Sequence, residues 1–293
     1  MPELPEVETV RIGLQALLPG REIARVNFDW PKGFPNAESD VQAFLVGASV
    51  VTVARRAKVL LIELSSKYSL VIHLKMTGQL VFRSGGERFG AGHPNDSLIG
   101  ELPDKSTRVT FGFTDGSQLF FNDQRKFGWV RLMPTAEVPN IDFFQKVGPE
   151  PLAADFTWQA FRDRLQRRKN SGIKAVLLDQ TVVAGIGNIY ADESLWGAKI
   201  HPGTLVRNLS DQQIETLHKE LIAVLQLAIE KGGSTDKNYV NAEGKKGSYM
   251  SFARVFRREG QACPRCGTII IKTRVAGRGT HTCPHCQPEP KTA

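Results

Sequence analysis

The sequence lacks a long apolar run: none of its hydrophobic stretches approaches the ~20 residues that a helix needs to span a membrane. Its first residues are acidic and carry neither the basic nor the apolar segment of a secretory signal peptide. A heptad pattern and a self-complementary apolar stripe are missing as well. From these absences we expect a cytoplasmic, monomeric protein without a membrane partner.

Acidic residues are scarce at one end of a chain that is otherwise globular in composition, with 41% hydrophobic and 23% charged residues among 293. From residue 233 onward there are 11 Lys and Arg against 4 Asp and Glu, which is nearly all of the net charge of +8. The usual partner of such a basic segment is a polyanion, most often a nucleic acid. The alternative is a solvated tail without a partner.

Cysteine is also scarce, and all four cysteines lie between residues 263 and 286. Their spacing is C-x2-C, sixteen residues, then C-x2-C, which is the spacing of four-thiolate zinc sites. Two disulfides are the alternative, but an intracellular chain disfavours them. Four thiolates leave no coordination position open, so we predict one structural Zn²⁺ rather than a catalytic one. The predicted ligands are Cys263, Cys266, Cys283 and Cys286.

Between the two cysteine pairs, residues 268–273 have a strand pattern and residues 281–282 end a second strand. Glycines flank Arg278 and allow a tight turn, which puts the predicted tip of a zinc-ribbon hairpin at 277–279. A guanidinium at such a tip can bind phosphate through a pair of hydrogen bonds.

The chain begins Met1-Pro2-Glu3. A proline behind the initiator methionine usually leaves that methionine open to removal, and the new N-terminus is then a secondary amine. An α-amino group has a pKa of about 7.7–8, so part of it is neutral and nucleophilic near pH 7. Such an amine can form a Schiff base with an electrophilic carbon, and Glu3 is a candidate acid or base beside it. The alternative is an ordinary N-terminus, since many proteins begin with Met-Pro.

Apolar periodicity divides the chain into a strand-rich and a helix-rich part. A helix is predicted directly behind the N-terminus, and strand-like runs over 22–132 predict an antiparallel β-sandwich. Residues 83–105, rich in Gly, Pro and charge, have the composition of a long mobile loop. The Gly-Pro-Glu-Pro run at 148–151 marks a boundary, after which helical patterns continue to Gly232.

Two glycines, Gly185 and Gly187, precede Asn188 between predicted helices. Such a turn leaves backbone N–H groups available at a helix N-terminus, where phosphate binds well. A plain turn between helices is the alternative. The polar, Gly-rich residues 234–250 predict a loop that orders on a ligand.

Taken together, these motifs resemble the formamidopyrimidine-DNA glycosylase family of bacterial base-excision repair enzymes, from Met1 to Gln287. The related endonuclease VIII family typically begins PEGPE, so Leu4 favours the branch that acts on purine lesions. The matching motifs are PELPEVE at 2–8, RRAK at 55–58, HLKMTGQL at 73–80, RKFG at 125–128, GPEPL at 148–152, GIGNIYADE at 185–193 and the four cysteines.

The resemblance implies an α+β multidomain fold with three parts. Residues 1–147 would form a catalytic β-sandwich domain with flanking helices, and residues 148–233 a helical, helix-two-turns-helix DNA-binding domain. Residues 234–293 would form a lesion-recognition loop followed by a C-terminal four-cysteine zinc-ribbon hairpin.

The implied activity is that of a bifunctional DNA glycosylase and abasic-site lyase, which excises 8-oxoguanine and formamidopyrimidines from double-stranded DNA. A Schiff base on the N-terminal proline is followed by β,δ-elimination. In this scheme Pro2 attacks C1′ of the damaged nucleotide and Glu3 is its acid/base partner. Lys58 contacts phosphate and donates a proton during elimination, and Arg278 supports the later elimination step.

An enzyme that acts on a base in a duplex must flip that base out and fill the gap. The family fills it with a methionine, an arginine and an aromatic residue, which match Met76, Arg125 and Phe127. Arginine can hydrogen-bond the orphaned partner base, and phenylalanine can wedge between bases. The matching phosphate-contacting positions are His73, Lys169 and Asn188.

The chain departs from the family pattern at Ser106, where the family often has a histidine that contacts DNA. Arg108 and His93 are the nearby candidates to replace that contact. Met1 matters too, because a retained Met1 would turn the Pro2 nitrogen into an unreactive amide.

Three other functions are open at this point. One is an endonuclease VIII-like glycosylase for oxidised pyrimidines. The second is a non-catalytic damaged-DNA-binding zinc protein, which predicts loss of Pro2, Glu3 or Lys58, yet all three are present. An unrelated zinc-ribbon DNA-binding protein would explain the basic tail but not the N-terminus.

Overall fold

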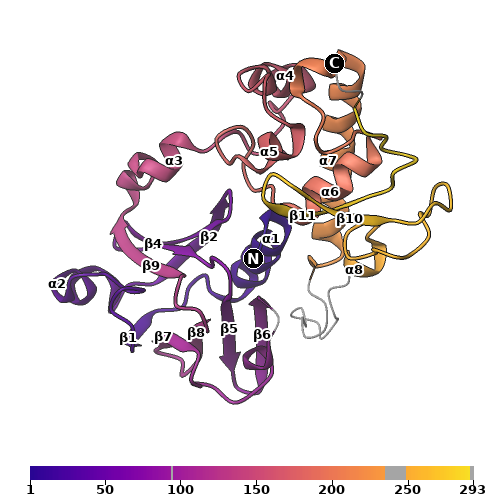
Figure 1. Ribbon diagram of the computed structural model, residues 1–293. Coiled ribbons are helices and arrows are strands. Elements are labelled where there is room, and N and C mark those ends of the chain that lie inside the picture. The colour runs from indigo at the N-terminus through magenta and orange to yellow at the C-terminus, as the bar shows by residue number, and fades with distance from the viewer. Residues whose placement is uncertain (94, 235–248, 291–293) are drawn as a thin grey trace. The chain divides into compact units, whose positions relative to one another are not determined.

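The computed structural model describes residues 1–93, 95–234 and 249–290, and the chain forms two compact units (Figure 1). The first unit comprises Met1–Gln145 and Ile229–Tyr249, and the second Lys146–Ala228 and Met250–Ala293. Most of the predicted loop at 234–250 lies outside the described residues. The three-part division of the chain at 147 and 233 stays a prediction. Among the described helices, none is both long and apolar enough to cross a membrane.

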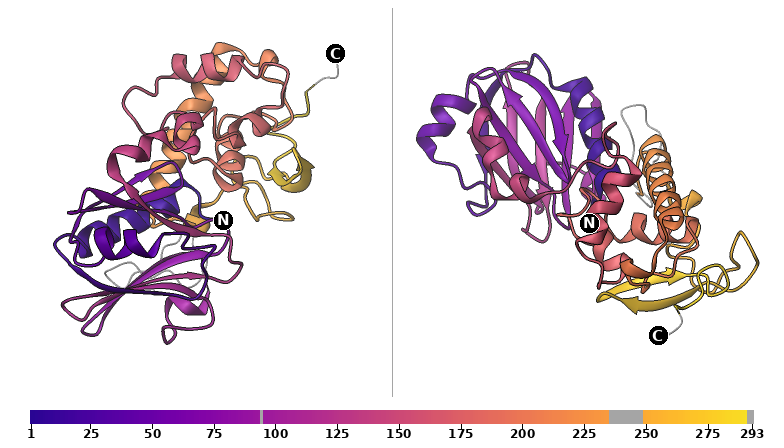
Figure 2. Two further views of the ribbon diagram at one scale, coloured as in Figure 1. Left: turned by 90° about the vertical axis from the view of Figure 1, so that its left-hand side faces the viewer. Right: turned by 90° about the horizontal axis from the view of Figure 1, so that it is seen from above.

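Two antiparallel sheets form the first unit, which confirms the predicted β-sandwich (Figure 2). One sheet has the strand order β1-β7-β8-β5-β6 and the other β2-β3-β4-β9. Apolar side chains from both sheets meet in one buried core, because successive strand residues point to opposite faces. The strands are β1 (Ile23–Phe28), β2 (Val50–Arg56), β3 (Val59–Leu64), β4 (Tyr68–His73), β5 (Gly78–Ser84), β6 (Glu87–Gly92), β7 (Thr107–Phe113), β8 (Gln118–Asp123) and β9 (Trp129–Pro134).

Helix α1 (Leu4–Leu17) packs against β2 and β6, which are edge strands of the two different sheets. Its apolar stripe, with Val7, Val10 and Leu14 fully buried, faces the core as its spacing predicts. The helix approaches β6 so closely that a Cβ on Gly13 would lie 2.1 Å from the Phe89 ring. The sandwich therefore fixes the helix whose first turn follows the N-terminal amine.

The mobile loop predicted over 83–105 is wrong for its first half. Strands β5 and β6 continue through it as a hairpin, with Ser84 paired to Glu87 across a Gly85-Gly86 turn. Both glycines have positive φ, which is the requirement of the tight hairpin turns that favour glycine. The Gly-rich, charged composition thus marks a turn between strands instead of an irregular loop.

Helices dominate the second unit, as the sequence predicts. Ser210 and Gln213 form a capping box before α7 (Asp211–Glu230), with the Ser210 N–H donating to Gln213 Oε1 at 2.9 Å and the Gln213 N–H to Ser210 Oγ at 3.2 Å. The helices of the chain beyond α1 are α2 (Glu38–Asp40), η1 (Val41–Leu45), η2 (Asp96–Leu98), η3 (Thr135–Asn140), α3 (Asp142–Lys146), α4 (Trp158–Gln166), α5 (Ile173–Leu178), α6 (Asn188–Gly197), η4 (Val206–Asn208), α7 (Asp211–Glu230) and α8 (Tyr249–Phe252).

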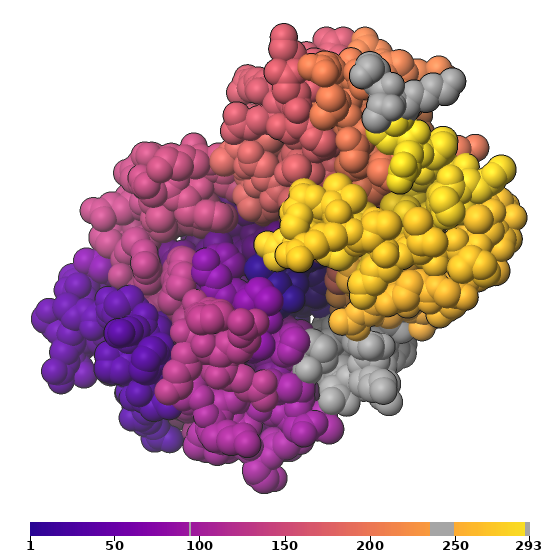
Figure 3. Space-filling model, in the orientation of Figure 1, coloured from indigo at the N-terminus to yellow at the C-terminus, as the bar shows by residue number. Residues whose placement is uncertain are grey.

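The predicted zinc-ribbon hairpin is formed by β10 (Ile271–Val275) and β11 (Arg278–Thr282), at the surface of the second unit (Figure 3). Its turn consists of Ala276 and Gly277, both with positive φ. The tip is therefore at 276–277 and not at the predicted 277–279. The first strand starts at residue 271, later than the predicted residue 268. Arg278 is the first residue of β11, paired with Val275, so a strand and not the turn fixes its backbone.

Candidate active site and metal centre

Pro2 and Glu3 are both buried at the start of α1, whereas Met1 is half-exposed. The Glu3 N–H donates to Glu6 Oε2 at 2.8 Å, and Glu6 Oε1 accepts from the Ser234 N–H at 2.7 Å. Glu6 thus ties the backbone next to the N-terminal amine to the segment after α7.

Lys58 is held by the turn between β2 and β3 and is only 5% exposed. Arg55 braces this turn: its Nε donates to Glu8 Oε2 on α1 at 2.8 Å and its Nη1 to the Ala57 carbonyl at 2.7 Å. Ala57 has a φ of +54°, so the turn needs such support. The same helix that Glu3 caps therefore also fixes the Lys58 backbone.

His73 ends β4 and pairs with Val59, the residue after Lys58. Its Nδ1 accepts from the Lys75 N–H at 3.0 Å. Burial, followed by the positive charges of Lys75 and Lys58, lowers the pKa of His73 from 6.5 to about 3. The ring is therefore neutral at pH 7 with its proton on Nε2, and this nitrogen can donate to a phosphate oxygen.

Arg125 and Phe127 project from a turn built around the buried carboxylate of Asp123. Asp123 accepts from the Gly128 N–H at 2.7 Å, from the Arg125 N–H at 3.2 Å and from the Thr77 hydroxyl. Gly128 is required here, because a Cβ would lie 2.7 Å from the Phe121 ring. The sequence argument did not identify Asp123 or Thr77; the adjacency of Asp123 to the RKFG motif was the available signal.

The side chains expected to fill the gap in DNA are exposed, unlike most apolar residues of the first unit. Phe127 is 53% and Met76 37% exposed. The Arg125 guanidinium lies 4.8 Å from the centroid of the Phe127 ring. Thr77, next to Met76, accepts from the Arg125 N–H at 3.1 Å, so the two segments are joined. The structure therefore brings Met76, Arg125 and Phe127 together on one unit.

Ser106, which stands where the family often has a histidine, faces inward. It is 2% exposed, and its hydroxyl bonds Asp104 Oδ1 at 2.7 Å. Arg108 is buried as well and donates to Asp29 and to the Asp123 carbonyl. His93 is only half-buried, and burial and the charge of the Met1 amine lower its pKa while Asp123 opposes the shift. Of the two candidates, His93 is the less buried one.

In the second unit, Lys169 is exposed after α4, and its carbonyl accepts from the Arg207 N–H at 2.9 Å. Asn188 starts α6, and its Nδ2 donates to the Gly279 carbonyl of β11 at 3.0 Å. One backbone N–H of the predicted phosphate turn is occupied: the Gly185 N–H donates to Gln180 Oε1 at 3.0 Å. The phosphate site at the start of α6 stays a prediction. Asn188 therefore joins α6 to the residue after Arg278.

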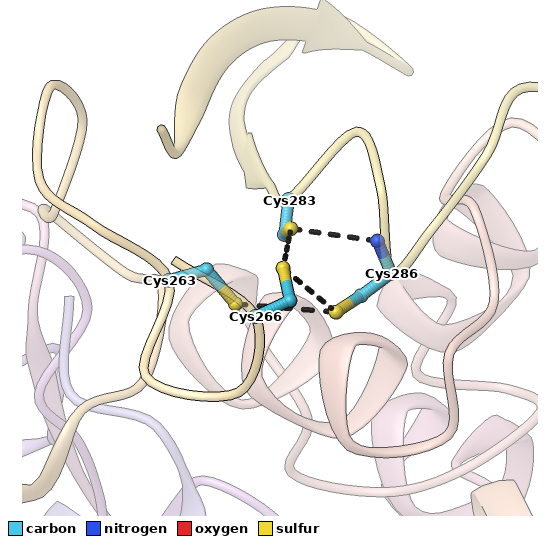
Figure 4. Close-up of side chains that lie close together, drawn as sticks. All are labelled: Cys263, Cys266, Cys283 and Cys286. Carbon is cyan, nitrogen blue, oxygen red and sulfur yellow. Dashed lines mark hydrogen bonds between the residues drawn. The ribbon is translucent and has the colours of Figure 1, made fainter. Parts of the chain in front are cut away.

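The four predicted zinc ligands gather at the base of the ribbon, with all sulfur atoms within 4.8 Å of one another (Figure 4). The Sγ–Sγ distances are 3.9 Å for Cys263–Cys286, 3.5 Å for Cys266–Cys283 and 3.6 Å for Cys266–Cys286. A tetrahedral site with zinc–sulfur bonds of about 2.3 Å has edges of about 3.8 Å. None of the four cysteines, all of which are described, forms a disulfide. The donor set thus fits one structural zinc ion.

Three family models match the chain. They are the formamidopyrimidine-DNA glycosylase N-terminal domain over residues 1–130, the H2TH domain of the same glycosylase over 147–239, and the zinc finger found in FPG and IleRS over 260–288. The fold, the buried N-terminal proline and the zinc centre therefore define a DNA glycosylase with a helix-two-turns-helix domain and a zinc finger.

Curated relatives and solved structures agree with this class. Formamidopyrimidine-DNA glycosylases from Pediococcus pentosaceus and Streptococcus mutans are each 42% identical, over 98% of this chain and 99% of theirs. A complex of a Lactococcus lactis FPG mutant with Fapy-dG-containing DNA has a TM-score of 0.86 at 36% identity, and covers 98% of this chain and all of that one. A complex of the wild-type L. lactis protein with oxidised-pyrimidine-containing DNA has a TM-score of 0.85 at the same identity and coverage. The chain belongs to the formamidopyrimidine-DNA glycosylase family.

Proposed function

We propose that this protein excises oxidised purines from double-stranded DNA and then cleaves the abasic site, with Pro2 as the nucleophile. The observation that carries the proposal is the N-terminus, where Pro2 and Glu3 are buried at the start of a helix that the sandwich fixes. The binding of Fapy-dG-containing DNA by the L. lactis relative supports the substrate class.

The reaction starts once Met1 is removed and the Pro2 nitrogen is an amine. This nitrogen attacks C1′ of the damaged nucleotide, the glycosidic bond breaks, and the base leaves with the bonding electrons and takes up a proton. Glu3 acts as the acid/base group for opening of the sugar. The resulting iminium acidifies the adjacent sugar carbon, so β-elimination and then δ-elimination release the two phosphates. Lys58 donates a proton in these steps, and Arg278 supports the later one.

Recognition combines gap filling with phosphate contacts. Met76 and Phe127 fill the space left by the extruded base, and Arg125 donates to the orphaned partner base, ideally a cytosine. His73 donates through its neutral Nε2, while Lys169 and Asn188 contact phosphate from the second unit. Because phosphate contacts release counterions, affinity should fall steeply with salt.

The same proposal includes a monomer that acts on DNA in the bacterial cytoplasm, associated with the nucleoid. The DNA-bound relatives support the partner. The concentration dependence of sedimentation in the absence of DNA tests the monomer, since a mass above 32.4 kDa that grows with concentration would contradict it.

The experiment is borohydride trapping on a duplex with 8-oxoguanine opposite C, with a thymine-glycol duplex in parallel. Mass spectrometry first confirms that the protein begins at Pro2. A covalent adduct that forms preferentially on the 8-oxoguanine duplex supports the proposal, and Pro2→Gly should slow or abolish it. Preference for thymine glycol would instead favour the second candidate, an oxidised-pyrimidine glycosylase. The complex of the L. lactis relative with oxidised-pyrimidine-containing DNA supports this candidate. Binding without any adduct would indicate a damage-binding protein.

A further inference from the structure

The second unit contains a buried ion pair that the proposed reaction does not use. Lys174 Nζ lies 2.6 Å from Asp192 Oδ1, and both side chains are 0% exposed. Lysine is almost never fully buried unless it is paired, because desolvation of its charge is costly. Lys174 belongs to α5 and Asp192 to α6, so the pair joins these two helices.

Both members of the pair also bind the zinc-ribbon hairpin. Lys174 Nζ donates to Thr280 Oγ1 at 2.7 Å and to the Gly279 carbonyl at 3.3 Å. Asp192 Oδ2 accepts from the His281 N–H at 2.9 Å and lies 3.3 Å from His281 Nδ1. These contacts fall on three successive residues of β11, the first of which directly follows Arg278.

The zinc site holds a different part of the same strand. Its nearest ligand, Cys283, is five residues beyond Arg278, and the other strand of the hairpin is mostly exposed. A two-stranded hairpin alone is marginally stable in water. The metal therefore anchors the base of the hairpin, while the buried pair and Asn188 hold the end that carries Arg278.

We propose that Lys174 and Asp192 are positioning residues for Arg278: through Gly279, Thr280 and His281 they fix the start of β11 on α6. This inference rests on the proposed role of Arg278 in elimination. Arg278 itself is exposed, so its guanidinium is placed by its backbone and not by packing of its side chain. A shift of about 1 Å in a positioned group can cost roughly 10²-fold in rate.

The test uses the full-length zinc protein and the double variant Lys174→Met with Asp192→Leu. This variant removes both buried charges together, because removal of one would leave the other unpaired. Borohydride trapping and base release report the first step, and the ratio of δ- to β-elimination products reports the Arg278-dependent step. We expect that ratio to fall by about the same factor as in Arg278→Ala, with base release changed less than threefold. In the combined triple variant the ratio should fall no further.

A matched control is Lys219→Met with Glu215→Leu, which removes an ion pair of 2.7 Å on the exposed face of α7 in the same unit. This control should leave the product ratio unchanged. Cobalt substitution of the zinc site checks the metal centre: the thiolate-to-cobalt absorption bands should be the same in the wild type and in the buried-pair variant.

Hydrogen exchange of residues 278–282 separates this inference from the proposed role of Arg278. If the double variant loses protection there and keeps its cobalt bands, the positioning role is supported. This conclusion holds even if Arg278→Ala leaves elimination unchanged, because that result would contradict only the proposed role of Arg278. Unchanged protection together with an unchanged product ratio would overturn the inference. If the double variant loses its cobalt bands, Thr280→Val decides instead, since it keeps the side-chain shape and removes only the Lys174 contact. Lower protection at His281, whose N–H donates to Asp192 Oδ2, supports the inference, and wild-type protection there overturns it.

Discussion

The two units hold the cationic side chains of the proposed site in different ways. In the first unit, the turns that carry Lys58 and Arg125 rest on a large apolar core, and one carboxylate each, Glu8 or Asp123, fixes the turn. In the second unit, the hairpin of Arg278 rests on a small cluster in which cysteines themselves are core members. A small core provides little stabilisation, so metal ligation takes its place, while a buried ion pair joins the hairpin to the helices.

The largest expected effect is that of zinc removal, because the two units should respond to it differently. Metal binding contributes about 10–16 kcal/mol in small zinc domains, so chelation should unfold residues 263–286 and abolish DNA binding. The sandwich core contains no metal ligand among its described residues and should stay folded. Hydrogen exchange after chelation, with DNA binding measured in parallel, tests this difference. Full DNA binding by a metal-free protein would refute the structural role of zinc.

Glu3→Gln should have the next largest effect, and it should be confined to chemistry. General acid–base groups contribute roughly 10²–10⁴-fold, so we expect single-turnover base release to slow by that factor. DNA affinity, to which the second unit contributes, should change little. The matched control is Glu87→Gln at an exposed position of the same unit. If Glu3→Gln weakened binding instead of slowing base release, the assignment of Glu3 as an acid/base group would be wrong.

Asp123→Ala tests whether one carboxylate supports the turn of Arg125 and Phe127. The substitution leaves the Arg125 and Gly128 N–H groups and the Thr77 hydroxyl without their acceptor, and we expect a loss of about 3 kcal/mol in the free energy of unfolding. Discrimination for cytosine opposite the lesion should fall as well. Urea denaturation and excision from duplexes with each partner base measure the two effects. Asp40→Ala, at an exposed position, should stay within about 0.5 kcal/mol of the wild type; an equally small effect at Asp123 would contradict its role.

Local sequence patterns predicted those features of the two units that depend on the spacing of residues along the chain. The zinc ligands follow from two C-x2-C pairs, and the sandwich follows from alternating apolar residues. The hairpin at 83–92 was missed because its glycines and charges resemble a loop, although the two turn glycines, Gly85 and Gly86, both have positive φ. The acceptor of the Gly185 N–H could not be predicted, because the side chain of Gln180 reaches it only in the folded turn.

The supporting carboxylates could not be predicted because their partners are distant in sequence. Asp123 bonds Thr77 across 46 residues, and Lys174 bonds Thr280 across 106. A lysine in a helical pattern predicts an exposed side chain, and only the tertiary fold turns Lys174 inward. Sequence motifs thus identify residues expected to touch DNA, whereas the residues that hold them in place emerge from packing.

The smallest effect is a pH dependence that belongs to the first unit. Because the pKa of His73 is about 3 in the folded protein and near 6.5 when unfolded, the unfolded chain binds a proton here more readily. The contribution of His73 to the free energy of unfolding is therefore complete above pH 6.5. It is lost as the pH falls from 6.5 toward 3, and about 2 kcal/mol of it is lost at pH 5. His73→Gln removes this titration, so its urea midpoint should fall less between pH 7 and 5 than that of the wild type. An equal fall of the urea midpoint in both proteins would mean that the pKa of His73 is not lowered by folding, which would contradict a ring that stays neutral down to pH 5.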